Sequence, residues 1–335
     1  MLDRTKPASI TLWEGRTIPR LGMGCWAIGG PFYAGDVPLG WGDVDDAESI
    51  RAIHRAIELG IRFFDTASNY GAGHSEEVLG EALMGQPDIV VATKFGFATD
   101  PLTKQATGAF ASPEFIRASV ETSLTRLKRE RIDLLQFHLN EFDPVEADTV
   151  FATLDNLWAE GKIAAYGWST DWPERAARFA GRAGFHSVQH TMNVLEPADG
   201  MIALVEQTDL ISINRGPLAM GLLSGKFKPG DRLAANDVRS ADFDWLHYFR
   251  DGVVAPEFTR RLDTIRDLLQ TEGRTLAQGA LAWLWARSPN TLPIPGFRTV
   301  KQVEENAGAL DKGPLSASTM DAIDDALQRP RYSSI

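Results

Sequence analysis

Residues 61–94 read IRFFDTASNYGAGHSEEVLGEALMGQPDIVVATK, and this stretch decides the fold. It opens with the run IRFFD at 61–65 and closes with a second run, DIVVATK, at 88–94. Both runs are apolar on both faces, which is typical of parallel strands that are covered by helices. Helical patterns separate runs of this kind along the chain, so the stretch predicts one strand–helix–strand unit.

The same rhythm continues through the rest of the sequence. Six further strands are predicted, at 19–24, 133–138, 163–169, 186–190, 210–214 and 291–295. Helix starts are indicated at Asp45, with Glu48 three residues later, and at Ser112-Pro113. Eight strands that alternate with helices, without a linker, favour a (β/α)8 TIM barrel over a doubly wound open sheet. We therefore expect an α/β protein with a single barrel domain over residues 1–335.

Two segments exceed the minimal barrel. Residues 9–19, SITLWEGRTIP, alternate around Glu14-Gly15 in the manner of a β-hairpin. Residues 224–256 form a long irregular stretch after the seventh strand. A loop of that length in a compact domain is usually functional. We expect an N-terminal hairpin and long loops at the carboxyl face of the barrel.

Composition narrows the class of protein. The 335 residues are 44% hydrophobic and 24% charged, as in ordinary soluble domains. The net charge of −11 repels phosphate backbones and anionic lipid, so neither nucleic acid nor membrane is an expected partner. No apolar stretch reaches the roughly 20 residues of a membrane span, and no signal peptide is readable. The single cysteine excludes an internal disulfide framework and a cysteine-rich zinc module. We expect a cytoplasmic protein without a metal site; its oligomeric state is not readable.

Polar residues end three successive predicted strands. Asp65, Lys94 and His138 occupy these ends, and Tyr70 follows Asp65 by five residues. Each has an ordinary structural explanation by itself, such as a helix cap or a solvated strand end. In a barrel, however, the carboxyl ends of the strands converge on the active site. A lysine held in a partly dry mouth needs a counter-ion, and Asp65 on the neighbouring strand is the natural one.

This combination indicates proton transfer. A free tyrosine has a pKa near ~10, and a close ammonium lowers it. We expect Lys94 to tune Tyr70 in this way, so that the phenol can exchange a proton with a substrate oxygen. A nearby imidazole, that of His138, can orient the carbonyl oxygen and stabilise its charge.

Several segments resemble the aldo-keto reductase family. They are GWGDVDDAESIRAIHRAIELGIRFFDTASNYGAGHSEEVLGEAL at 40–83, KFGF at 94–97, DLLQFH at 133–138, GPLAMGLLSGKF at 216–227 and PIPGFRTVKQVEENAGAL at 293–310. The resemblance is strongest to the bacterial branch near the potassium-channel β-subunit-like reductases. It implies a barrel that binds NAD(P)H without a Rossmann domain, and the G-x-G-x-x-G fingerprint is indeed absent. It also implies that Tyr70 is the general acid/base, that Lys94 and Asp65 support it, and that His138 orients the substrate.

The resemblance further implies which residues bind the cofactor. They are Ser169, Thr170, Gln189, Arg215, Pro217, Leu218, Gly221, Leu223, Gly296, Arg298, Gln302, Glu305 and Asn306. Thr170 stands where the family usually has asparagine. Arg215 stands where an aromatic residue usually stacks on the nicotinamide, and either stacks there itself or serves a phosphate at the rim. Arg298 lies beside a helix start at Thr299 and can bind a 2′-phosphate, which favours NADP(H), with NAD(H) as the alternative.

The substrate is less readable than the cofactor. Trp26, Trp41 and Phe95, with the aromatic stretch DFDWLHYF at 242–249, are expected to wall an apolar pocket. We expect an NADPH-dependent reductase of aldehyde or ketone carbonyls, whose partner is a small-molecule substrate. Two alternatives stay open: an NAD(P)-dependent dehydrogenase of a sugar or secondary alcohol, and a cofactor-sensing regulatory subunit with slow turnover.

Overall fold

A computed structural model describes residues 9–228 and 230–330. Eight parallel strands form one sheet in the order β16-β13-β12-β11-β10-β7-β6-β3. Their bounds are Met23–Gly24 (β3), Phe63–Asp65 (β6), Val90–Phe95 (β7), Leu134–Phe137 (β10), Tyr166–Ser169 (β11), Phe185–Thr191 (β12), Ile211–Arg215 (β13) and Thr291–Pro293 (β16). Each of the eight predicted runs contains one of these strands to within one residue at either end. The barrel prediction is confirmed.

The first and last strands close the barrel. The Gly22 N–H donates to the Pro293 carbonyl at 3.0 Å, and the Gly24 N–H donates to Pro295 at 3.0 Å. A parallel bridge also joins Gly24 to Gly296. These bonds satisfy the backbone groups that would otherwise be left at two exposed sheet edges.

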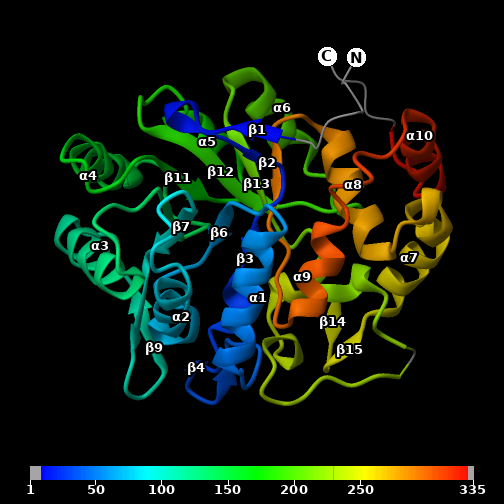
Figure 1. Cartoon of the computed structure of the whole chain (residues 1–335), viewed down its shortest axis with the longest axis horizontal. Helices are drawn as coiled ribbons and strands as arrows, with labels where there is room; N and C mark the ends of the chain where they lie inside the picture. The colour runs from blue at the N-terminus through cyan, green and yellow to red at the C-terminus, as the bar shows by residue number, and fades with distance from the viewer. Residues whose placement is uncertain (1–8, 229, 331–335) are drawn as a thin grey trace.

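Ten helices are described, mostly on the outside of the strands (Figure 1). They are Asp46–Glu58 (α1), His74–Ala82 (α2), Pro113–Leu127 (α3), Ala147–Ala159 (α4), Pro173–Phe179 (α5), Asp199–Thr208 (α6), Pro256–Leu269 (α7), Leu276–Arg287 (α8), Val300–Ala307 (α9) and Ala317–Ala326 (α10). Both predicted helix starts are present. The Asp45 side chain accepts the Glu48 N–H, and the side chain of Ser112, the residue before Pro113, accepts the Phe115 N–H. None of the described helices is long and apolar enough to cross a membrane.

The strands separate two hydrophobic cores. An outer core lies between strands and helices, and an interior core fills the barrel. The predicted hairpin is present as β1 (Ser9–Thr11) and β2 (Thr17–Pro19). Leu12, Trp13 and Ile18 from this segment join the interior core, so the hairpin closes the amino end of the barrel. Figure 1 shows β1 and β2 at the end opposite β4, β9, β14 and β15.

Strand alternation carries charge to the other end of the interior. Every second side chain of a barrel strand faces inward. Val90 and Ala92 of β7 belong to the interior core, and Lys94 is the next residue in their row. On β6, Phe63 is followed in the same way by Asp65. The interior is therefore apolar at the hairpin end and charged at the carboxyl end.

The loops at the carboxyl face contain more regular structure than predicted. The stretch 224–256 is not simply irregular: it carries β14 (Phe249–Arg250) paired with β15 (Val253–Val254), and two short 3-10 turns. A second small sheet joins β4 (Tyr33–Ala34), β5 (Val37–Pro38), β8 (Phe97–Asp100) and β9 (Gln105–Ala109). Strands of two to five residues are too short to produce a readable alternation.

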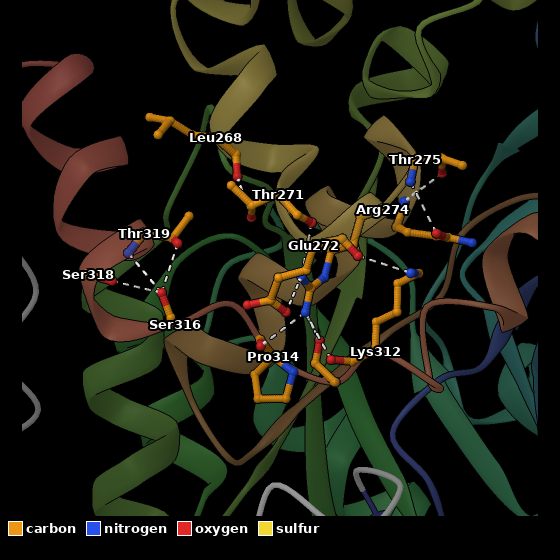
Figure 2. A network of polar contacts seen from close by, with 12 residues as sticks. Leu268, Thr271, Glu272, Arg274, Thr275, Lys312, Pro314, Ser316, Ser318 and Thr319 are labelled. Carbon is orange, nitrogen blue, oxygen red and sulfur yellow. Dashed lines mark hydrogen bonds and ion pairs between the residues drawn. The ribbon is translucent and has the colours of Figure 1, made fainter.

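Figure 2 shows the network around Arg274, in the turn between α7 and α8. Its guanidinium donates to the Thr271 carbonyl at 3.2 Å, to the Glu272 carboxylate at 2.8 Å and to the Lys312 carbonyl at 2.9 Å. Arg274 is buried, so these bonds compensate its desolvation. The network ties the α7–α8 turn to the segment that leads into α10.

Helix α8 packs closely against the end of α7 at Gly279. A Cβ atom at this position would lie 1.9 Å from the carbonyl oxygen of Leu269. We expect Gly279→Ala to lower the free energy of unfolding by about 3 kcal/mol in urea denaturation, because backbone must move to admit a methyl group. Gly181 has nothing within 4 Å, and Gly181→Ala should change stability by less than about 0.5 kcal/mol. Equal effects would contradict the close packing.

Candidate active site

A buried ion pair lies at the carboxyl end of the barrel interior. The Lys94 Nζ donates to Asp65 Oδ1 at 2.5 Å and to the Thr66 carbonyl at 2.8 Å. Lys94 has no exposed surface and Asp65 is 2% exposed. Burial opposes the charged ammonium, but the charges of Asp65 and Tyr70 outweigh it and raise the pKa of Lys94. The lysine is therefore protonated at neutral pH.

Two amide side chains hold the other oxygen of Asp65. Gln136 of β10 donates to Oδ2 at 3.0 Å, and Gln189 of β12 donates to it at 2.8 Å. Gln136 was missed in the sequence, although it is the one polar residue within LLQF. Gln189 was predicted to bind the cofactor; one hydrogen of its amide nitrogen bonds Asp65, which leaves its second N–H to donate and its amide oxygen to accept from a carboxamide.

Tyr70 lies beside the ion pair. Its hydroxyl is 3.4 Å from Lys94 Nζ, and it opens the 3-10 turn Tyr70–Gly73 that leads into α2. Burial raises the pKa of Tyr70, and the charge of Lys94 opposes that rise without reversing it. The expectation of a phenol tuned toward neutrality is therefore wrong for the net direction: the tyrosine is protonated at neutral pH.

His138 completes the group. Its ring meets that of Tyr70 edge to face at 5.9 Å, and that of Phe97 at 5.2 Å. Burial, and then the charges of Lys94 and Arg215, lower the pKa of His138 well below 6.5, so the imidazole is neutral. The structure thus brings Tyr70 together with the three residues predicted at the strand ends.

Thr170 and Arg215 are partly committed to other partners. The Thr170 hydroxyl donates to the Asn140 carbonyl at 3.0 Å and accepts the Trp172 N–H at 3.3 Å. One lone pair of the hydroxyl oxygen remains, so the contact of Thr170 with the cofactor stays a prediction. Arg215, at the end of β13, pairs with Asp171, while its buried Nε has no partner among the described residues. Ser169, directly before Thr170, is buried at the end of β11.

Two cations converge on the turn after β13. Gly221 adopts φ +93°, and a Cβ atom there would lie 3.4 Å from Arg239 Nη1 and 3.5 Å from Lys226 Nζ. Arg239 is held by Asp237 and by the Met220 carbonyl at 3.0 Å. Both cations were missed; Lys226 lies within the quoted segment 216–227, but Arg239 gives no sequence signal.

The other residues predicted on this turn differ in what they offer. Pro217 is buried and Leu218 half-buried. Leu223 is also buried, and its N–H donates to the Leu218 carbonyl at 3.1 Å. The side chain and the N–H of Leu223 are therefore engaged within the protein, and its contact with the cofactor stays a prediction.

The segment that opens α9 is already bonded within the protein. Arg298 donates to the carbonyls of Trp41, at 3.0 Å, and Asp43. The Gln302 side chain accepts the Arg298 N–H at 2.7 Å. In a capping box it would instead accept the N–H of Thr299, the residue that caps α9. Glu48 of α1, which sequence reasoning assigned to its own helix start, instead accepts the Val300 N–H at 2.9 Å. A carboxylate therefore stands at the helix start that was expected to hold a 2′-phosphate.

The remaining adenosine-end residues surround this segment. Gly296 is exposed, Glu305 is half-buried and Asn306 is buried on α9. The Glu305 carbonyl accepts a bond from Gln278 at 3.1 Å. Glu305 and Asn306 lie within α9, and Gly296 lies four residues before it.

Aromatic rings extend from Tyr70 toward the long loop. Trp26 stacks on Tyr70 at 5.7 Å, and meets Trp41 at 5.5 Å and Trp245 at 6.1 Å. Trp245, from the stretch 242–249, is half exposed. Phe95 does not belong to this group: it is 1% exposed and stacks on Phe137 in the outer core. Alternation explains the correction, because Phe95 faces away from the interior that Lys94 faces.

Fold and site together define a (β/α)8-barrel protein with a lysine–carboxylate pair and a tyrosine at the carboxyl end of its strands. A sequence model of the aldo/keto reductase family matches residues 20–328. The chain belongs to this family, and membership makes it an NAD(P)H-dependent oxidoreductase.

Individual relatives cover nearly the whole chain. An uncharacterized oxidoreductase of Mycobacterium bovis, Mb2320, is 31% identical over 92% of this chain and 89% of its own length. Aldo-keto reductase yakc [NADP(+)] of Schizosaccharomyces pombe is 26% identical over 92% and 88%. The solved structure of the glycerol dehydrogenase AKR11B4 from Gluconobacter oxydans is 29% identical, covers 98% of both chains and has a TM-score of 0.82.

The Asp65–Lys94 pair should be costly to break from one side. Asp65→Asn leaves a buried ammonium without its counter-charge, and we expect a loss of about 3–5 kcal/mol in the free energy of unfolding. Adding Lys94→Met should restore much of it. Asp263→Asn, which breaks an exposed pair with Arg266, should change stability little. Urea denaturation of the four proteins checks this; an unrescued double variant would contradict the pairing argument.

Proposed function

We propose that this protein reduces aldehyde or ketone carbonyls with NADPH, and that Tyr70 supplies the proton. The observation that carries the proposal is the position of Lys94 Nζ, which contacts Asp65 on one side and the Tyr70 hydroxyl on the other. The arrangement keeps an ammonium beside the oxygen that would become negative after proton donation.

The carboxyl face fits a nicotinamide dinucleotide. Around Gly221 a side chain is absent and two cations converge, which suits a diphosphate. Buried polar atoms of Trp41, Gln136 and Arg215 have no partner within the described residues, so they can bond a polar ligand. When bound, the cofactor supplies a hydride to the carbonyl carbon.

The chain's own residues would then handle the proton. Tyr70, protonated at neutral pH, donates to the substrate oxygen as charge develops there. Lys94 stabilises the phenolate that remains, and Asp65 keeps the ammonium in place. The neutral His138 can orient the carbonyl oxygen by a hydrogen bond, because it carries no charge of its own to desolvate. Trp26 and Trp41 border the position at which the rest of the substrate would lie.

Alcohol oxidation is a second candidate function. The relative AKR11B4 is described as a glycerol dehydrogenase and matches over 98% of both chains. The same residues would act in reverse, with a Tyr70 phenolate as the base. Sugars or other secondary alcohols are the corresponding substrate class.

Tyr70→Phe should lower kcat for carbonyl reduction by about 10²- to 10⁴-fold and leave NADPH affinity unchanged, because only the proton donor is lost. The wild-type rate should stay flat from pH 7 to 9 and fall above about pH 10, since the raised pKa of Tyr70 keeps its acid form present below its ordinary value of 10.0. NADPH oxidation and NADP⁺ reduction, with carbonyl and polyol panels, measure both directions.

Tyr166→Phe is the matched control for this variant. Tyr166 lies on the helix side of the barrel, where its hydroxyl donates to the Asp155 carboxylate. It should retain wild-type kcat. Unchanged turnover in Tyr70→Phe would remove the tyrosine from the mechanism.

Glu48 should weaken the preference for a 2′-phosphate. Glu48→Gln keeps an oxygen for the Val300 N–H but removes a negative charge at the start of α9. We expect NADPH to bind about five- to tenfold more tightly, because the variant no longer repels the 2′-phosphate electrostatically. NADH lacks this phosphate, so its affinity should change little. Nucleotide fluorescence titrations measure both affinities, with Glu58→Gln of the same helix as control. Parallel changes for both nucleotides would mean that the 2′-phosphate binds elsewhere.

A further inference from the structure

A second buried carboxylate lies behind the Tyr70 turn. Glu76, in the first turn of α2, has no exposed surface. Its Oε1 accepts the Thr93 hydroxyl at 2.6 Å, and its Oε2 accepts Arg126 of α3 at 3.4 Å. Neither Glu76 nor Arg126 belongs to the proton-transfer group described above. The cost of burying the Glu76 carboxylate therefore needs another explanation.

Glu76 holds the strand that carries Lys94. Thr93 directly precedes Lys94 on β7, and side chains of neighbouring residues face opposite sides of a strand. The hydroxyl of Thr93 bonds Glu76 outside the barrel, while Lys94 bonds Asp65 inside it. The carboxylate therefore fixes the outer side of the backbone that positions the ammonium.

Arg126 holds the turn that carries Tyr70. Its Nη1 donates to the Ser68 carbonyl at 3.3 Å, two residues before Tyr70. On the other side of Tyr70, Gly73 adopts φ +101°, and a Cβ atom there would lie 2.2 Å from the Arg126 guanidinium carbon. The guanidinium thus lies directly against the turn, and only glycine admits it so closely.

We propose that Glu76 and Arg126 are positioning residues that set the separation between Lys94 Nζ and the Tyr70 hydroxyl. One carboxylate is linked to both sides of this 3.4 Å contact, to Lys94 through Thr93 and to Tyr70 through Arg126. The inference rests on the proposed function for its catalytic meaning, but the separation itself can be tested without turnover.

Glu76→Gln is the principal variant, and Asp324→Asn is its control. Asp324 is also buried and pairs with an arginine, Arg329, but on α10 and away from Tyr70. Both should lose stability. Only Glu76→Gln should lower kcat, by about tenfold, because a shift well below 1 Å at reacting groups already matters. NADPH affinity should stay within about twofold in both, since neither residue lies among the predicted cofactor contacts.

A spectroscopic readout separates positioning from general destabilisation. With 3-fluorotyrosine incorporated, ¹⁹F NMR follows the ionisation of Tyr70, assigned by the signal lost in Tyr70→Phe. The groups that act on Tyr70 electrostatically, Lys94, Asp65 and Arg215, are unchanged in every variant. We expect the Tyr70 midpoint to rise by about half a pH unit in Glu76→Gln, as the ammonium moves away, and to stay fixed in Asp324→Asn.

Each result then decides the inference. A fixed Tyr70 midpoint in Glu76→Gln, or an equal shift in Asp324→Asn, overturns it whatever happens to kcat. If Glu76→Gln does not fold, Thr93→Val removes a single bond to the same carboxylate and should produce a smaller shift in the same direction; no shift overturns the inference. If the wild-type protein reduces no carbonyl, the proposed function fails, while the midpoint still reports on positioning.

Discussion

A lysine without exposed surface is tolerated in this barrel because Asp65 neutralises it at 2.5 Å. Burying a lone ammonium would cost several kcal/mol, and a carboxylate repays that cost only when its remaining lone pairs are satisfied. Gln136 and Gln189 satisfy them from two further strands. The pair therefore draws four strands of the barrel, β6, β7, β10 and β12, toward one point, and the position of Tyr70 has meaning only relative to it.

Much of the fold was readable because strand burial follows a simple period. A run such as DIVVATK shows the inward row Val90, Ala92 and Lys94 directly, and the same rule places Phe95 on the other face. Applying it consistently would have removed Phe95 from the substrate residues and added Gln136 to the site. The short strands of the carboxyl-face loops have no such period, so the structure in 224–256 was not predictable from pattern.

The contacts that the sequence did not reveal join segments distant in sequence. Thr170 was assigned to the cofactor from the family resemblance, and in the structure its hydroxyl also bonds Asn140, thirty residues earlier. Glu48 matches the spacing of a capping box on α1, and yet bonds Val300, 252 residues later. A local motif shows which polar groups need hydrogen-bond partners. It does not show which of several possible partners lies closest once the chain has folded into a barrel. Both of these contacts, Thr170 with Asn140 and Glu48 with Val300, lie at the expected cofactor site. The chemistry of that site was therefore harder to predict than that of the strand ends.

The direction of the Tyr70 shift changes how the site is understood. A lysine was expected to make the phenol acidic, whereas burial of the phenol outweighs the lysine and the net pKa rises. The lysine still matters, because without it the phenolate would be less stable again. At neutral pH the site thus holds a proton ready to give, and forming the phenolate first costs ~1.36 kcal/mol for each unit by which the pKa exceeds the pH. The same residues can serve both directions: carbonyl reduction uses the protonated phenol directly, whereas alcohol oxidation must first form the phenolate, and this asymmetry depends on burial that no spacing in the sequence contains.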